Sequence, residues 1–101
     1  MTMAAREMTV TTPDGLPYID LERVVDAPRD LVFRCYTEPD LVRQWLGPEK
    51  YEMVIDHWES RDGGRYRYVH KDPAGGEYGF HGVFHGTPTP DRMVQTFEFE
   101  L

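Results

Sequence analysis

The sequence contains one cysteine, no long hydrophobic run and no signal-peptide pattern at its start. A lone Cys35 cannot form an internal disulfide and is typical of proteins from a reducing compartment. Because Cys35 lies within a helical apolar pattern, we expect a buried core residue rather than a catalytic nucleophile. No segment approaches the roughly 20 apolar residues of a membrane-spanning helix, and residues 1–12 lack the apolar stretch of a secretion signal. The sequence therefore predicts a cytoplasmic protein.

Positive charge is also scarce. Lysine and arginine total 11 against 18 aspartate and glutamate residues, which gives a formal net charge of -7. The basic residues are scattered, whereas nucleic-acid binding requires a basic stripe that neutralises phosphates. An anionic membrane would repel such a surface. We therefore expect neither nucleic acid nor membrane as a partner.

The 101 residues are enough for one domain with a single hydrophobic core. Residues 1–17 are predicted to be a lead-in, either disordered or with a short strand over 8–12 that ends at the turn signal Pro13-Asp14-Gly15. Residues 18–101 are predicted to form the domain itself, beginning with a strand over 18–25.

Two short helices are predicted between residues 26 and 46. Asp26 can cap the first helix, with Pro28 in its opening turn. Thr37 can cap the second, where Asp40 completes a weak capping box, and Gly47-Pro48 should end it. Apolar residues at helical spacing mark the buried stripes of the two helices: Leu31, Val32, Cys35 and Tyr36 in the first, and Leu41, Val42, Trp45 and Leu46 in the second.

After residue 50 the hydrophobic pattern changes to the two-residue period of β-strands. Turn-forming segments separate the strands, which predicts an antiparallel meander. The predicted strands cover residues 51–58, 65–70, 78–85 and 93–101. The last alternation continues to the final residue, and two short helices give the sheet too little cover. We therefore predict an incomplete domain whose apolar face is covered by further residues or by a partner.

No metal, cofactor or catalytic residue is predicted. His81 and His85 share a strand face but lie about 13 Å apart, whereas two ligands of one zinc ion each lie about 2 Å from it. The glycine pairs at 63–64 and 75–76 are expected to be hairpin turns. Carboxylates are present, but spacing alone does not show the paired environments that acid–base catalysis needs. The residues favour a protein without catalytic activity but leave an enzyme open.

Aromatic side chains are the most informative feature of the strands. On a half-covered sheet they either complete the core or form the wall of a hydrophobic ligand cavity, with tyrosine hydroxyls orienting the ligand. The aromatic residues concerned are Trp45, Trp58, Tyr66, Tyr68, Tyr78, Phe80, Phe84, Phe97 and Phe99.

Five segments, in order, resemble the bacterial relatives of the heat-shock-protein-90 ATPase activator, within the SRPBCC (START-like) superfamily. The segments are Asp26-Ala27-Pro28 with Val32-Phe33, residues 37–41 leading to Trp45-Leu46-Gly47-Pro48, residues 61–68, Gly82-Val83-Phe84, and residues 95–100. The resemblance covers residues 18–101. It implies an α+β, helix-grip fold: a curved antiparallel sheet wraps around a long C-terminal helix, two short helices follow the first strand, and Gly82 lies where the sheet bends. Family members continue past Leu101 with further strands and the long helix, which this chain does not contain.

Three functions are consistent with this resemblance. The first is a non-enzymatic binding domain for a small hydrophobic ligand, with Trp45, Trp58, Tyr66, Tyr68 and Phe97 as wall residues. The second is a chaperone-regulating or other protein-interaction module. The third is an enzyme like the cyclases and dehydratases of the superfamily, which would need Arg23, Arg67 or His81 inside the cavity. The uncovered sheet also suggests a homodimer.

Overall fold

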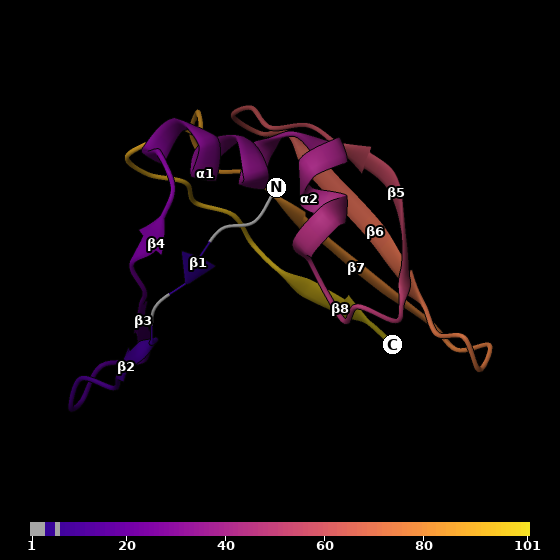
Figure 1. Ribbon diagram of the computed structural model, residues 1–101, viewed down its shortest axis with the longest axis horizontal. Helices are drawn as coiled ribbons and strands as arrows, with labels where there is room; N and C mark the ends of the chain where they lie inside the picture. Colours follow the sequence, from indigo (N-terminus) through magenta and orange to yellow (C-terminus); the bar gives the residue numbers. More distant parts are fainter. Residues whose placement is uncertain (1–3, 6) are drawn as a thin grey trace.

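The computed structural model describes residues 4–5 and 7–101 (Figure 1). The described residues form two short helices and eight strands. In chain order these are β1 (Ala4–Ala5), β2 (Thr9–Thr11), β3 (Asp20–Glu22), β4 (Val25–Asp26), α1 (Arg29–Thr37), α2 (Pro39–Trp45), β5 (Glu52–Trp58), β6 (Arg65–Lys71), β7 (Glu77–Val83) and β8 (Glu98–Glu100).

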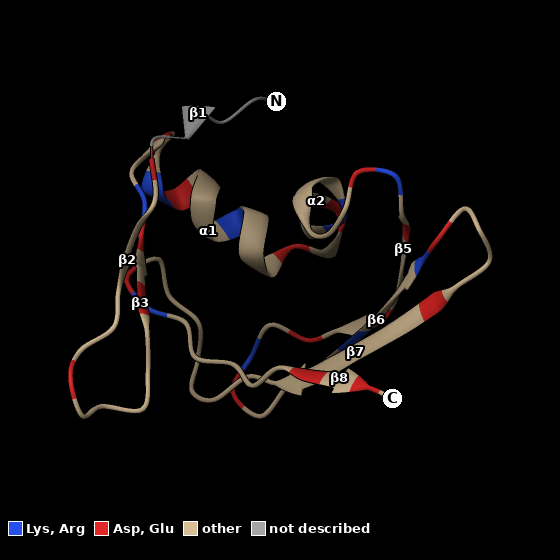
Figure 2. Ribbon diagram, turned by 90° about the horizontal axis from the view of Figure 1, so that it is seen from below, with Lys and Arg blue, Asp and Glu red and all other residues tan. Residues whose placement is uncertain are grey.

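The main sheet has four antiparallel strands in the order β5-β6-β7-β8. Tyr66 of β6 lies opposite Trp58 of β5 and Gly82 of β7, and Phe80 of β7 lies opposite Phe99 of β8. Both helices lie on the same side of this sheet (Figure 2). The predicted α+β class and antiparallel meander are therefore confirmed.

The last strand is shorter than predicted. Only Glu98–Glu100 pair regularly with β7, whereas Gln95 forms an isolated bridge with Phe84. Between these two pairings, the hydroxyl of Tyr66 donates to the carbonyl of Thr96, and the Thr96 side chain accepts from the backbone N–H of Val83 at 2.9 Å. Side chains thus take backbone groups that a regular ladder would use, and the predicted strand over 93–101 is wrong in its first half.

The N-terminal strands do not join the main sheet. β2 pairs with β3 and β4 pairs with β1, each in a separate two-stranded sheet. The turn at Pro13 to Gly15 connects β2 to β3, and the hairpin extends away from the rest of the molecule (Figure 1). The single strand predicted over residues 18–25 is therefore wrong, because the chain changes pairing partner between β3 and β4.

Both predicted helix caps are wrong. Pro28 occupies the N-cap position of α1 in place of Asp26, and Glu38 occupies that of α2. Thr37 belongs to the end of α1, where its hydroxyl donates to the carbonyl of Phe33 at 3.0 Å. The predicted end of α2 is confirmed, since Gly47 follows with a φ of 88°. A side chain at Gly47 would also lie 2.2 Å from the His70 ring.

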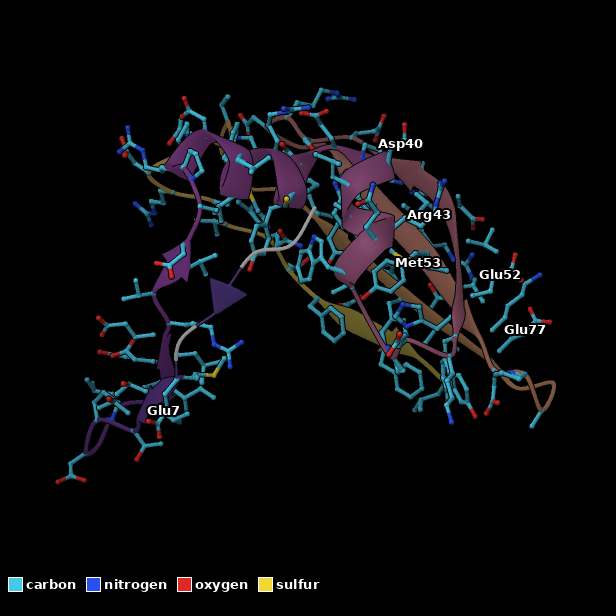
Figure 3. All side chains as sticks on the ribbon, viewed as in Figure 1. Glu7, Asp40, Arg43, Glu52, Met53 and Glu77 are labelled. Atoms are coloured by element: carbon cyan, nitrogen blue, oxygen red, sulfur yellow. The ribbon has the colours of Figure 1, made fainter. Side chains whose placement is uncertain are left out.

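The core lies between α2 and the inner face of the sheet, the face that the two helices cover. Its buried members are Val42, Met53, Tyr66, Tyr68 and Phe84, with Leu46, Ile55, Trp58, Phe80 and Met93 packed against them. Met53 points into this layer, whereas Asp40 and Arg43 of α2 lie outside it (Figure 3). Cys35 is buried, as predicted, but Tyr36 beside it is exposed. Within the described part of the chain, no helix is both long and apolar enough to cross a membrane.

Candidate functional site: an aromatic cavity beneath the second helix

Strand β6 separates two chemically different faces of the sheet. Side chains alternate between the faces of a strand, so Tyr66, Tyr68 and His70 lie buried on the inner face while Arg65 and Arg67 lie on the outer one. The sequence pattern of β6 therefore places aromatic rings under α2 and charges on the opposite side.

The inner-face rings form a continuous layer across the four strands. The ring centroids of Trp58 and Tyr66 are 4.8 Å apart, those of Tyr68 and Phe80 are 5.1 Å apart, and those of Phe80 and Phe97 are 5.4 Å apart. Such distances are typical of stabilising aromatic pairs. The layer extends from β5 to the segment before β8.

Gly82 leaves room for the Tyr66 ring within this layer. A Cβ atom at position 82 would lie 2.1 Å from the carbonyl oxygen of Thr96 and 2.5 Å from the Tyr66 ring. The absence of a side chain lets Tyr66 lie flat against β7 and reach Thr96 with its hydroxyl.

A cavity of about 170 Å³ lies between this layer and the helices. All five predicted wall residues, Trp45, Trp58, Tyr66, Tyr68 and Phe97, line it together. The described residues that line it are Tyr36, Val42, Trp45, Leu46, Trp58, Tyr66, Tyr68, Gln95 and Phe97. None of these side chains carries a charge, and Gln95 contributes the only amide.

Trp45 and Phe97 form the open side of the cavity. The indole N–H of Trp45 donates to the carbonyl of Cys35 at 2.7 Å, and its ring contacts Tyr36 at a centroid distance of 4.8 Å. Trp45 is thus held by α1, although it belongs to α2. Phe97 is 61% exposed, so an apolar ring faces solvent at the entrance.

The polar groups of the wall differ in whether they have a partner. The Tyr66 hydroxyl is committed to Thr96. Tyr68 is 3% exposed, and no hydrogen bond of its hydroxyl is present among the described residues. Burial raises the pKa of Tyr68 to about 12, with a smaller contribution from Tyr66. The indole N–H of Trp58 is buried and also has no acceptor among the described residues.

His70 extends the inner face beyond the cavity, a position that was not predicted for it from the sequence. It is 6% exposed, and desolvation lowers its pKa, although a hydrogen bond with the backbone of Leu46 acts in the opposite direction. The alternation Tyr66, Tyr68, His70 was the signal that could have placed it inside.

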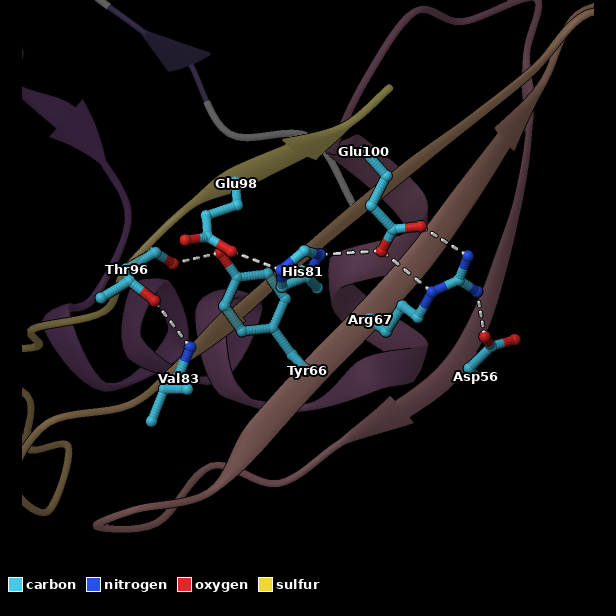
Figure 4. A network of polar contacts seen from close by, with 8 residues as sticks. All are labelled: Asp56, Tyr66, Arg67, His81, Val83, Thr96, Glu98 and Glu100. Carbon is cyan, nitrogen blue, oxygen red and sulfur yellow. Dashed lines mark hydrogen bonds and ion pairs between the residues drawn. The ribbon is translucent and has the colours of Figure 1, made fainter.

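The outer face carries a network of ion pairs (Figure 4). Arg67 donates to Glu100 at 2.8 and 3.0 Å and also contacts Asp56. His81 lies between Glu100, at 2.8 Å, and Glu98. These hydrogen bonds, first that with Glu100, raise the pKa of His81, whereas Arg67 and His81 lower that of Glu100.

The hypothesis that Arg67 or His81 projects into the cavity is therefore wrong, because both lie on the other face of the sheet. Arg23, the third candidate, is exposed between β3 and β4 and is not part of the cavity lining. In residues 4–5 and 7–101, no group of three or more histidine, cysteine, aspartate or glutamate side chains could hold a metal ion.

An antiparallel sheet with two short helices over an aromatic cavity defines a domain of the SRPBCC, START-like class. Residues 26–100 match the family described as "Activator of Hsp90 ATPase homolog 1-like protein", and the chain belongs to this family. A comparison with curated proteins gave no match.

Solved structures from three bacteria have a similar fold. Protein CV1439 from Chromobacterium violaceum is 27% identical, with a TM-score of 0.69 over 73% of this chain. A Rhodobacter sphaeroides protein is 22% identical, with a TM-score of 0.82 over 92% of this chain. Protein Ms6760 from Mycobacterium smegmatis is also 22% identical, with a TM-score of 0.64 over 72% of this chain. The matched regions cover 52%, 61% and 46% of those structures respectively, so the chain spans about half the length of these neighbours.

Proposed function

We propose that this protein is a non-enzymatic binding domain for a small hydrophobic ligand. The observation that carries the proposal is the cavity itself, whose lining consists of aromatic and aliphatic side chains with a few uncharged polar groups. Ligand sites of proteins have this composition. Burial of an apolar ligand would be favourable by about 25 cal/mol per Å² of apolar surface removed from water.

Both tryptophans of the chain line the cavity, so intrinsic fluorescence reports on its occupancy. We expect indane, a compact bicyclic hydrocarbon, to produce a saturable change in tryptophan emission and a rise in melting temperature. Leu46→Phe should fill the cavity and abolish both responses. Val94→Phe adds the same ring at an exposed position outside the lining and should retain them.

Folded wild-type protein that gives neither response to indane nor to other compact apolar compounds overturns the proposal. A response that persists unchanged in Leu46→Phe would place binding elsewhere and would equally count against this cavity.

A protein-interaction role is the second candidate, and two observations favour it. The name of the matched family refers to activation of the Hsp90 ATPase. In addition, the β2–β3 hairpin exposes apolar side chains, namely Val10, Leu16, Tyr18, Ile19 and Leu21. Hsp90 ATPase rates measured with and without this protein test the role, and an unchanged rate at saturating protein contradicts it.

A homodimer through the uncovered sheet and a cytoplasmic location remain predictions. The exposed rings of Phe97 and Phe99 support the first. Light scattering on the purified protein tests it, with Phe99→Glu expected to shift a dimer to monomers and a monomeric wild type contradicting it.

A further inference from the structure

The polar groups of the cavity wall point to a particular ligand chemistry, an inference that rests on the proposed function. The size of the cavity gives the first restriction. At about 170 Å³ it is smaller than the roughly 300–1,000 Å³ pockets that hold drug-sized ligands. It therefore suits a ligand of one or two rings.

The absence of charge in the lining gives the second restriction on the ligand. Among the residues that the structure describes, no charged side chain lines the cavity. Charged groups of the sheet lie on its outer face, in the network of Asp56, Arg67, His81, Glu98 and Glu100. An ion in the cavity would lose its hydration without gaining a counter-ion, which is strongly unfavourable. The occupant is therefore uncharged.

The hydrogen-bond inventory gives the third restriction. The N–H of Trp45 and the hydroxyl of Tyr66 already donate to backbone carbonyls. The hydroxyl of Tyr68 makes no hydrogen bond within the described chain, although its side chain is almost completely buried. The oxygen of this hydroxyl is not among the buried side-chain atoms that lack a partner, and Tyr68 lines the cavity, so a ligand in the cavity can reach the hydroxyl and pair with it.

An acceptor on the ligand fits better than a donor. The raised pKa of Tyr68 keeps its hydroxyl protonated and able to donate. The indole N–H of Trp58, a second donor in the same wall, also has no acceptor among the described residues. The indole N–H is itself buried, so the donor that a ligand can reach is the Tyr68 hydroxyl, which an oxygen acceptor such as a carbonyl complements.

We infer that the cavity binds an uncharged ligand of one or two rings that carries a carbonyl-type acceptor, and that the Tyr68 hydroxyl donates a hydrogen bond to this acceptor. Tyr68 is thus a specificity-determining residue, whereas the neighbouring Tyr66 supports the sheet.

A matched pair of probes, indane and 1-indanone, tests the inference because they differ only in one carbonyl group. Tyr68→Phe should weaken 1-indanone binding by about threefold to tenfold, the effect of one hydrogen bond, and leave indane binding unchanged. Tyr66→Phe is the matched control, since it removes the hydroxyl that is already committed to Thr96. It should change the affinity of both probes equally.

The carbonyl stretching frequency of bound 1-indanone gives a second measurement that needs no variant. A hydrogen bond should lower this frequency relative to 1-indanone in an apolar solvent. The anion indane-1-carboxylate should show no saturable binding at concentrations that saturate with 1-indanone.

Equal effects of Tyr68→Phe on indane and 1-indanone, or a carbonyl frequency equal to that in the apolar solvent, overturn the inference while the proposed function stands. Tight binding of the carboxylate overturns the requirement for an uncharged ligand. If neither neutral probe binds, the proposed function and the inference fail together.

Discussion

The two faces of the four-stranded sheet use the same strands for opposite purposes. The inner face carries stacked aromatic rings and the uncharged cavity, and the outer face carries the ion-pair network centred on Arg67 and Glu100. Adjacent positions of β6 differ accordingly, since Tyr66 is buried and Arg67 is partly exposed. The difference shows that the alternation of a single strand positions both the candidate site and the surface that keeps charge away from it.

The pKa values of two histidines, one on each face, are shifted in opposite directions. His70 on the inner face has a lowered pKa because burial disfavours its charged form. His81 on the outer face has a raised pKa because Glu100 and Glu98 stabilise the charged form. The same side chain is therefore held neutral on one face and favoured as a cation on the other.

The largest expected effect concerns burial on the inner face. Phe84 is completely buried against Trp58 and Tyr66. Phe84→Ala should lower the free energy of unfolding by about 3–5 kcal/mol, the usual cost of removing a core aromatic ring. Phe97→Ala, the same change at an exposed rim position, should cost well under half as much. Chemical denaturation of both variants measures the difference, and equal losses would contradict the assigned burial.

A smaller loss of stability is expected at Gly82, where the backbone of β7 closely approaches Tyr66 and Thr96. Gly82→Ala places a methyl group against the carbonyl of Thr96 and the Tyr66 ring, so we expect a loss of about 1–3 kcal/mol from overpacking. Gly79→Ala is the matched control on the same strand, because its nearest neighbours are side-chain atoms of Glu100 and Arg67 rather than a backbone carbonyl. Denaturant unfolding should show the greater loss for Gly82→Ala, and the reverse order would count against this close approach.

The smallest effect is the pH dependence of the two histidines. The raised pKa of His81 gives a stabilisation that is fully present below its unfolded pKa of about 6.5 and is lost as pH rises through the folded value. The lowered pKa of His70 gives a stabilisation present above about 6.5 that is lost as pH falls through the folded value.

Melting temperatures measured from about pH 5 to about pH 9, which spans the range in which histidine titrates, separate these two contributions to stability. His81→Gln should remove the loss of stability on the alkaline side, and His70→Phe should reduce the loss on the acid side. If both variants change the profile of melting temperature against pH in the same direction, the assignment of opposite environments to the two histidines is wrong.

Much of the sheet and of the candidate site was predictable because strand alternation is a local property. The two-residue period placed three of the four main strands to within two residues at each end. All five proposed wall residues line the cavity, and three of them, Trp58, Tyr66 and Tyr68, lie on these strands. The sequence could not identify which face is inside, because alternation is symmetric until the helices pack against one side.

The predictions that failed depended on which partner a group takes, either within its own helix or far along the chain. The cap at Thr37 was wrong because its hydroxyl bonds back to Phe33 within the same helix. The long final strand was wrong because Tyr66, thirty residues earlier, takes the carbonyl of Thr96. His70 was left unplaced because its burial depends on the contact with Gly47 after α2.

The sequence by itself determined the α+β class, the order of helices and strands, the family resemblance and the aromatic composition of the wall. These follow from residue spacing, turn chemistry and local motifs, which act over a few residues of chain. Only the tertiary structure decided that Arg67 and His81 are excluded from the cavity and that the Tyr66 hydroxyl is committed while that of Tyr68 is unpaired. Burial and hydrogen-bond partners are decided by packing between segments far apart in the chain, so no local pattern contains them.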